Sequence, residues 1–227
     1  MFFSLLLSFF TVTLFAQSAR LTENFDNGWK FNPGDVNNAN DPLFNDASWR
    51  SLNLPHDWSI ELPFDSTSPT GTGGGALRGG MGWYRKTFTL PASSKTKHVF
   101  IDFDGVYMNS EVFINGHSLG IRPNGYISFR YELSPFLKFG TEKNVIAVKV
   151  NNESQPNSRW YSGSGIYRNV WLVTTSDVFV DHWGTYITTP EINKTSATLH
   201  IETSLVNSSN KTQRISLQNI IYDRNLL

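Results

Sequence analysis

Apolar and polar residues alternate along most of the chain after Arg20, in short runs bounded by Gly, Pro, Asn and Asp. A period of two is typical of strands that bury one face, whereas an amphipathic helix repeats about every 3.6 residues. The pattern therefore predicts an almost entirely β fold. The clearest strands are expected at Trp83–Leu90, His98–Phe103, Glu111–Ile114, Asn144–Val150, Asn169–Val173, Phe179–Thr188, Ala197–Leu205 and Arg214–Ile221.

The segments between these strands carry recognisable turn chemistry. Ile114 is followed by Asn115-Gly116, the pair that best adopts the positive φ angles of a tight hairpin turn. Short helical turns are expected only at Asp46–Ser51 and Ser134–Leu137. Residues Leu62–Gly82 have no period and are rich in glycine, and a loop of that length is commonly functional or mobile.

The spacing of the strands predicts two β-sandwich domains with a boundary near Ser176. Residues 20–176 would form the first domain. The 51 residues from 177 to 227 hold about three expected strands, whereas an immunoglobulin-like sandwich needs about seven. We therefore expect residues 177–227 to be an incomplete immunoglobulin-like β-sandwich, and the chain to be a fragment of a longer protein.

Residues 1–19 contain no charged side chain, and Phe2–Ala16 form a nearly apolar run that ends in small residues. This pattern is typical of a secretory signal peptide, although the segment before the run has no Lys or Arg. The run is shorter than the 18 or more residues of a membrane-spanning helix. The expected location is periplasmic or extracellular, with no membrane association after cleavage of residues 1–19.

Composition and charge exclude several classes of partner and site. Lys+Arg and Asp+Glu both number 19, so the formal net charge is zero, and no basic run is present to neutralise phosphates. Nucleic acid is therefore excluded as a partner. Aromatic residues make up 14% of the chain, which fits either a β-rich core or a surface that stacks on sugars. No cysteine is present, and the five histidines show no metal-binding spacing, so we predict no metal site.

Several motifs follow one another in a specific order. They are Leu54–Trp58 (LPHDW), Gly82–Phe88 (GWYRKTF), Phe103–Ser110 (FDGVYMNS), Val112–Gly116 (VFING), Gly125-Tyr126 and Arg159–Arg168 (RWYSGSGIYR). From about Trp29 to Val173 the chain resembles glycoside hydrolase family 2, in particular the N-terminal sugar-binding domain of bacterial β-galactosidases. The resemblance implies a jelly-roll (galactose-binding-like) β-sandwich, followed in such enzymes by an immunoglobulin-like domain and a catalytic barrel with two glutamates.

No catalytic residue is expected in this chain. Retaining hydrolysis needs two carboxyl groups about 5 to 5.5 Å apart. Asp102 and Asp104 would share a strand face, but they are better explained as ordinary strand-edge and turn residues. Asp57 lies beside His56, and adjacent residues rarely point at one centre. The missing catalytic barrel of the same chain is therefore an expected partner.

The resemblance implies that loops of this domain shape the rim of the pocket for a terminal β-linked sugar. The candidate substrate-binding residues are Arg159, Trp160, Tyr161, Arg78 and Asp57. Arg159 to Tyr161 combine a fork-shaped donor with rings suited to stacking, and packing between domains is the alternative role. Arg78 is the only charge in its part of the glycine-rich segment, for which a disordered loop is the alternative.

The favoured function is thus the non-catalytic N-terminal portion of an exported family 2 glycosidase. A free-standing carbohydrate-binding module and a β-sandwich adhesion protein remain alternatives. The sequence does not separate a galactoside from a glucuronide or mannoside as substrate. Members of the family often need Mg²⁺ or Na⁺, but their ligands have no matching positions here, so the cofactor is unknown.

Overall fold

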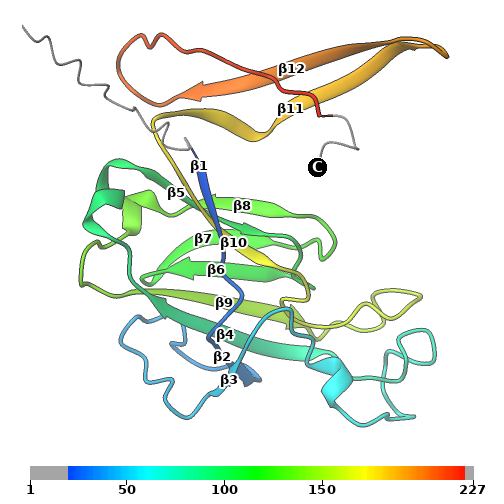
Figure 1. Ribbon diagram of the computed structural model, residues 1–227. Helices are drawn as coiled ribbons and strands as arrows, with labels where there is room; N and C mark the ends of the chain where they lie inside the picture. Colours follow the sequence, from blue (N-terminus) through cyan, green and yellow to red (C-terminus); the bar gives the residue numbers. More distant parts are fainter. Residues whose placement is uncertain (1–19, 223–227) are drawn as a thin grey trace, which may run out of the picture.

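The computed structural model describes residues 20–222, which form an all-β fold with three short 3₁₀ helices (Figure 1). The signal-peptide prediction for residues 1–19 lies outside the described residues. The strands are β1 (Arg20–Asn24), β2 (Trp29–Pro33), β3 (Arg50–Leu52), β4 (Gly80–Phe88), β5 (His98–Phe103), β6 (Ser110–Ile114), β7 (His117–Arg122), β8 (Phe129–Glu132), β9 (Asn144–Asn152), β10 (Val170–Thr175), β11 (Val178–Ile192) and β12 (Ala197–Asn207). The 3₁₀ helices are η1 (Ser59–Glu61), η2 (Ala92–Thr96) and η3 (Ser134–Phe136).

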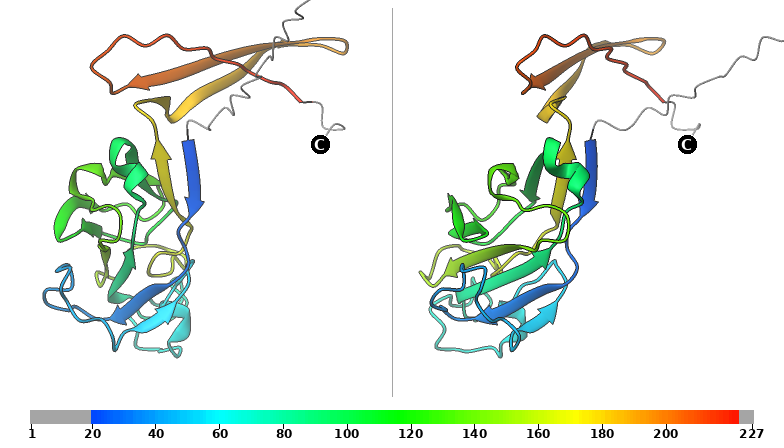
Figure 2. Two further views of the ribbon diagram at one scale, coloured as in Figure 1. Left: turned by 60° about the vertical axis from the view of Figure 1, so that its left-hand side comes forward. Right: turned by 90° about the vertical axis from the view of Figure 1, so that its left-hand side faces the viewer.

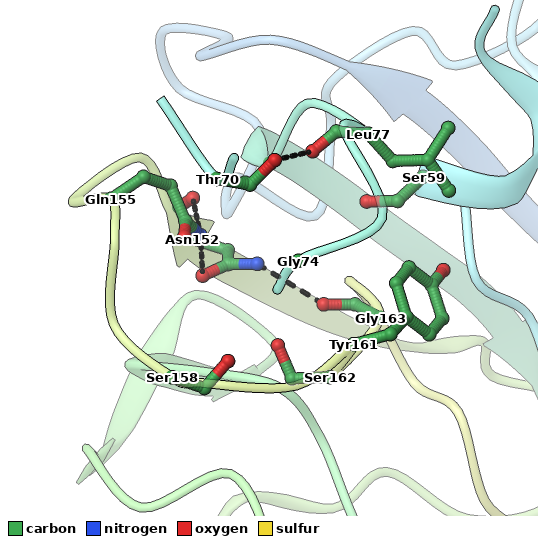
Figure 3. Close-up of a pocket in the computed structure, with 11 residues that line it drawn as sticks. Ser59, Thr70, Gly74, Leu77, Asn152, Gln155, Ser158, Tyr161, Ser162 and Gly163 are labelled. Carbon is green, nitrogen blue, oxygen red and sulfur yellow. Dashed lines mark hydrogen bonds between the residues drawn. The ribbon is translucent and has the colours of Figure 1, made fainter. Parts of the chain in front are cut away.

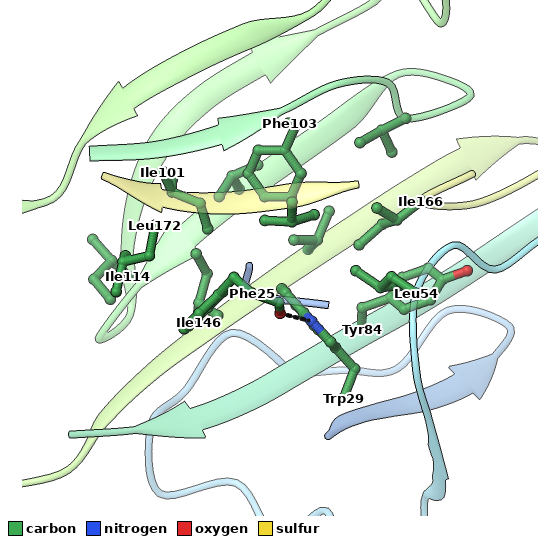
Figure 4. Close-up of a cluster of buried hydrophobic side chains, with 14 of the residues drawn as sticks. Phe25, Trp29, Leu54, Tyr84, Ile101, Phe103, Ile114, Ile146, Ile166 and Leu172 are labelled. Carbon is green, nitrogen blue, oxygen red and sulfur yellow. Dashed lines mark hydrogen bonds between the residues drawn. The ribbon is translucent and has the colours of Figure 1, made fainter. Parts of the chain in front are cut away.

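Two antiparallel sheets pack face to face over residues 20–175. One has six strands in the order β3-β2-β4-β9-β6-β7, and the other has four in the order β1-β10-β5-β8. Alternation decides which side chains enter the core: Val99, Ile101 and Phe103 of β5 are fully buried, while the residues between them are partly exposed. Figure 4 shows Ile101 and Phe103 of β5 among the buried side chains of this core, with Tyr84 and Ile146 of the other sheet. The predicted β-sandwich is confirmed.

The tight hairpin predicted at Asn115-Gly116 joins β6 to β7. Ile114 pairs with His117, which leaves a two-residue loop, and both loop residues have positive φ, 49° and 86°. Asn115 also accepts a hydrogen bond from the Val145 amide through its side chain. The turn therefore has the left-handed conformation that this residue pair favours, and it is tied to β9.

Two local predictions are wrong. Residues 46–51 contain no helix. The Trp49 amide donates to the Asp46 carbonyl in an isolated four-residue turn, and strand β3 begins at Arg50. Residues 214–221 form no strand and are exposed, because no described strand offers them a backbone partner. Among the described residues, the segment after Ser176 thus holds two strands rather than about three.

Those two strands, β11 and β12, form a long antiparallel hairpin beyond the end of the sandwich (Figures 1 and 2). Most of their side chains are exposed. At its base, the Phe179 ring lies 5.8 Å from the Phe100 ring on the outer side of the four-stranded sheet, and the Arg20 guanidinium donates to the Val180 carbonyl. The hairpin is therefore attached to the sandwich at the beginning of β11.

Candidate functional site

The pairing of β4 with β9 brings two long loops together. Gly80, the first residue of β4, pairs with Asn152, the last residue of β9. Residues 62–79, here the glycine-rich loop, lead into β4, and residues 153–169, here the site loop, leave β9 at the same end of the sheet. The two loops touch: a methyl group added at Gly73 would lie 3.1 Å from the Arg159 carbonyl oxygen. The register of the sheet thus places Arg78 and Arg159 to Tyr161 on neighbouring loops.

Asn152 holds the site loop from beneath. Its side-chain nitrogen donates to the Gly163 carbonyl at 3.1 Å and to Ser164 Oγ at 2.8 Å. Its side-chain oxygen accepts from Asn157 at 2.6 Å and from Gln155 at 2.9 Å. Figure 3 shows Asn152 between Gln155 and Gly163, with Ser158 and Ser162 farther along the loop. Because Asn152 is buried, these bonds are protected from competition with water and fix the loop.

Asp57 holds the same part of the site loop from a second side. Its Oδ1 accepts hydrogen bonds from the amides of Ser59 at 2.9 Å and Ser164 at 2.8 Å, and its Oδ2 accepts one from the Tyr161 hydroxyl. Gly163 has a φ of +74° and lies so close that an added methyl group would be 2.6 Å from Asp57 Oδ2. Asp57, predicted to bind substrate, therefore turns inward and orders the backbone.

Arg159, Trp160 and Tyr161 are all exposed on this fixed backbone. The Trp160 ring is 59% exposed and its indole nitrogen donates to the Tyr126 hydroxyl at 2.9 Å. Burial, followed by the hydrogen bond to Asp57, raises the pKa of the Tyr161 hydroxyl, which stays protonated. Within residues 20–222, no hydrogen bond or ion pair engages the Arg159 guanidinium. Arg159 is therefore the residue of this group whose side-chain donors have no partner among the described residues.

Arg78 is held within its own loop. Its Nε donates to Asp65 Oδ2 at 2.6 Å, and its backbone carbonyl accepts from Ser59 Oγ at 2.9 Å. Hydrogen bonds from Thr67 and then from Arg78 lower the pKa of Asp65 to about 2. The glycine-rich loop therefore has a defined conformation, and the Arg78 charge is already paired.

The space that these loops enclose is small. A cavity between Ser59, Asn152, Tyr161 and Gly163 has a volume of about 10 Å³, enough for one water molecule (Figure 3). A much larger groove of about 560 Å³ lies beside it. Its walls and rim are Phe31, Pro33, Gly34, Arg50, Trp58, Glu61, Leu62, Gly79, Gly80, Met81 and Glu153. Its volume lies within the range of small-molecule pockets, and its lining combines aromatic and acidic side chains.

The sequence interpretation missed this groove, including Glu61 and Glu153. Trp58 stands inside a motif that the sequence analysis singled out, and it provides the signal that could have led there. The other lining residues come from β2 and the residue after it, β3, η1, the two ends of the glycine-rich loop, the start of β4 and the site loop. Only the folded sheet brings them together.

Beneath the rim, His56 connects the groove to the core. Its Nε2 lies 2.7 Å from an Arg50 nitrogen and its Nδ1 lies 2.7 Å from the Tyr84 hydroxyl. The same Nε2 lies 3.2 Å from Glu61 Oε1, so the ring joins the Arg50–Glu61 ion pair at the rim to a hydroxyl in the core. Burial lowers the pKa of His56, and the opposing attraction of Glu61 only partly offsets it. His56 is therefore a neutral structural residue.

Glu61 is ion-paired at this rim. It accepts two hydrogen bonds from Arg50, at 2.8 and 3.0 Å. Burial alone would raise the pKa of Glu61, but the Arg50 hydrogen bond and the nearby His56 outweigh it and hold that pKa below its usual value. A carboxylate that is engaged in this way is a poor proton donor.

Asp102 and Asp104 have separate partners. Asp102 forms a two-bond ion pair with Arg130, with both distances 2.6 Å, and Asp104 accepts from the Trp171 indole at 3.0 Å. Neither residue therefore acts as half of a catalytic carboxyl pair. Among residues 20–222, no group of three or more His, Cys, Asp or Glu is arranged to hold a metal ion, and no helix is long and apolar enough to cross a membrane.

Comparison with known proteins places this geometry in a family. The model of the sugar binding domain of glycosyl hydrolases family 2 matches residues 58–176, which include Trp58, both loops and β10. The chain is 53% identical over 206 residues to the β-galactosidase BoGH2A of Bacteroides ovatus, covering 91% of this chain and 24% of that protein. It is 45% identical over 189 residues to a putative β-glucuronidase of Formosa agariphila, covering 83% of this chain and 18% of that protein.

Solved structures agree. A β-glycosidase from Bacteroides vulgatus superposes with a TM-score of 0.78 at 47% identity, over 84% of this chain and 25% of that one. The chain thus spans about a quarter of the length of the proteins it matches. From the order of motifs, the β-sandwich and these matches, the chain belongs to glycosyl hydrolase family 2 and contains the sugar binding domain of that family.

Proposed function

We propose that this chain is the N-terminal, non-catalytic portion of an exported family 2 glycosidase that hydrolyses terminal β-linked sugars, with β-galactosides as the preferred class. The observation that carries the proposal is Arg159. It stands exposed and without a partner among the described residues, on a loop that Asn152 and Asp57 fix from beneath. An ordered loop with unused donors is suited to contact a substrate or the catalytic domain.

The chemistry of hydrolysis requires more than the described residues supply. Glu61 and Glu153 line one groove, but both oxygens of Glu61 are bound to Arg50. The nucleophile and the acid/base would therefore come from a barrel elsewhere in the same protein, as the family resemblance implies. In this arrangement Arg159, Trp160 and Tyr161 form one rim of the sugar pocket.

The charge of the groove favours a neutral sugar. Its acidic side chains are Glu61 and Glu153, and its cation Arg50 is already paired with Glu61. A uronic acid would bring a further negative charge to this groove, whose lining residues include no unpaired cation and do not include Arg159. The higher identity to a β-galactosidase than to a putative β-glucuronidase supports the same preference.

Arg159→Ala in the complete enzyme tests the assignment. If Arg159 bonds sugar hydroxyls or orients a barrel carboxylate, kcat/KM for a chromogenic β-galactoside should fall about ten- to several-hundred-fold, the loss expected for charged hydrogen bonds. The melting temperature should hardly change, because Arg159 is exposed. Arg214→Ala, at an exposed position far along the chain, is the matched control and should keep the wild-type rate.

One combination of results would contradict a role for Arg159 in substrate binding. A lower melting temperature with unchanged kcat/KM would make Arg159 a strut between domains and remove it from the site. Export is tested separately by the mass of the mature protein, which should correspond to loss of the segment at residues 1–19.

A further inference from the structure

The outer face of the four-stranded sheet carries a row of polar and aromatic side chains. Arg130 of β8 pairs across the sheet with Asp102 of β5, and Asp102 pairs with Trp171 of β10. Their alternation with Ile101 and Leu172, which enter the core, puts all three on the outside. Arg130 and Asp102 form a two-bond ion pair, and the Trp171 indole donates to Asp104, so the row is rigid.

A large bulge in β11 covers this row. Val180 pairs with Leu205 and Thr185 with Thr203, so residues 181–184 face the single residue Ser204. Trp183 adopts a φ of +54° in the bulge and is 74% exposed. Its ring stacks on the His182 ring, with centroids 4.4 Å apart. The bulge therefore exposes an indole ring that is not part of the hydrophobic core.

The row and the bulge enclose a hollow of about 290 Å³. Trp171 and Trp183 supply its aromatic surface, and Asp102, Arg130 and His182 supply polar atoms. The side chains of Asp102 and Arg130 are only 16% and 13% exposed, so water competes only weakly for hydrogen bonds to them. The β11–β12 hairpin, which supplies His182 and Trp183 to the hollow, lies at one end of the sandwich, and the glycine-rich loop lies at the opposite end (Figure 1).

These features match one ligand chemistry. A pyranose presents C–H faces that pack on indole rings, and a perimeter of hydroxyl groups that both donate and accept hydrogen bonds. A carboxylate oxygen accepts up to two hydrogen bonds, so Asp102 can receive a hydroxyl while it holds Arg130. We propose that this hollow is a second carbohydrate-binding site, separate from the candidate site, which takes one neutral pyranose residue of a glycan.

The charges around the hollow balance. Arg20 and Arg130 face Asp102 and Asp181, and the Arg20 guanidinium also donates to the Val180 carbonyl. Burial, and then the nearby Arg130, lower the pKa of His182, which keeps its ring neutral. A neutral imidazole offers one donor and one acceptor, as a hydroxyl does. A neutral sugar fits this lining better than an anion, and binding here does not depend on which sugar the enzyme hydrolyses.

The test is a titration of the 227-residue protein with methyl β-D-galactopyranoside and methyl β-D-glucopyranoside, followed by NMR shifts of the tryptophan indole N–H signals. We expect saturable shifts at Trp171 and Trp183 for at least one of the two sugars, with a dissociation constant of about a millimolar. Trp183→Ala should weaken binding at least tenfold, and Asp102→Asn at least fivefold. Tyr186→Ala, an exposed aromatic in the same hairpin, is the matched control.

Other outcomes overturn the proposal. No saturable shift with either sugar would show that the hollow binds no pyranose. Loss of binding in Trp160→Ala but not in Trp183→Ala would place the sugar in the candidate site. Tighter binding of sodium D-glucuronate than of the methyl glucoside would contradict the neutral class. Because the readout is binding at the four-stranded sheet, each failure leaves the role of Arg159 untouched.

Discussion

The Tyr161 hydroxyl donates a hydrogen bond to Asp57 Oδ2 across 104 residues of sequence. The other oxygen of the same carboxylate binds the amides of Ser59 and Ser164. One acidic side chain therefore ties the start of η1 to the site loop. This relationship explains how a loop of irregular structure presents Arg159 and Trp160 in a defined position.

Removal of the Asp57 carboxylate should destabilise the protein more than removal of its tyrosine partner. Asp57→Ala leaves two amides without acceptors, and we expect the free energy of unfolding to fall by about 2 to 4 kcal/mol. Tyr161→Phe removes one hydrogen bond and should cost about 1 kcal/mol. Urea denaturation of both variants measures the difference. Equal losses would mean that the two amides find other acceptors, and that Asp57 does not organise the loop.

Stability should fall in mild acid because of His56. Burial lowers the pKa of His56 in the folded state, and the positive charge of Arg50 lowers it further. The negative charges of Glu61 and Asp57 raise it, but they do not offset the lowering. The unfolded chain therefore binds a proton more readily, and the free energy of unfolding should decrease as the pH falls below the ordinary histidine pKa of about 6.5. The loss should continue until the pH passes the lowered pKa of the folded state.

Thermal melts between pH 8 and pH 5 test this origin. His56→Gln should melt at a lower temperature throughout, because Tyr84 loses its partner, but should show a flatter dependence on pH. His200→Gln, at an exposed position on β12, should keep the slope of the wild type. A His56→Gln protein with the wild-type slope would assign the acid sensitivity to other groups.

Hydrogen exchange should separate the hairpin from the sandwich. Strand β9 is hydrogen-bonded on both sides, to β4 and β6, and most of its side chains are buried. Within residues 20–222, strands β11 and β12 pair only with each other, and most of their side chains are exposed. Amides of residues 185–203 should therefore exchange much faster than those of residues 145–150. Equally slow exchange in both segments would show that the hairpin is covered in solution.

The sequence predicted the β-sandwich because β5 alternates strongly and β9 is a short, almost continuous apolar run. Strand β5 and strand β9 carry enough buried Val, Ile and Phe for the pattern to be unambiguous. Strand β1 has the sequence RLTEN, with no side chain fully buried, so its place at the sheet edge depends on pairing with β10. The apolar run at residues 214–221 predicted a strand that the structure does not contain, because hydrophobicity alone does not supply a backbone partner.

The site was predictable only in part. Arg159 to Tyr161 stood out by residue type and motif, and the structure places them together on one exposed loop. The cluster of Arg50, His56 and Glu61 could not be read from spacing, because its members come from β3, a connecting segment and η1. Asn152 was not predictable as an anchor, because the four hydrogen bonds of its side chain form only once β9 ends beside the site loop.

The anchoring of the site loop by Asn152 and Asp57 has a consequence for laboratory evolution. The residues that fix the backbone are distinct from Arg159 and Trp160, which face outward. A combinatorial library randomised at those two exposed positions would therefore retain a high proportion of folded clones. Selection from that library could alter the range of accepted glycosides without compensating substitutions in the sandwich.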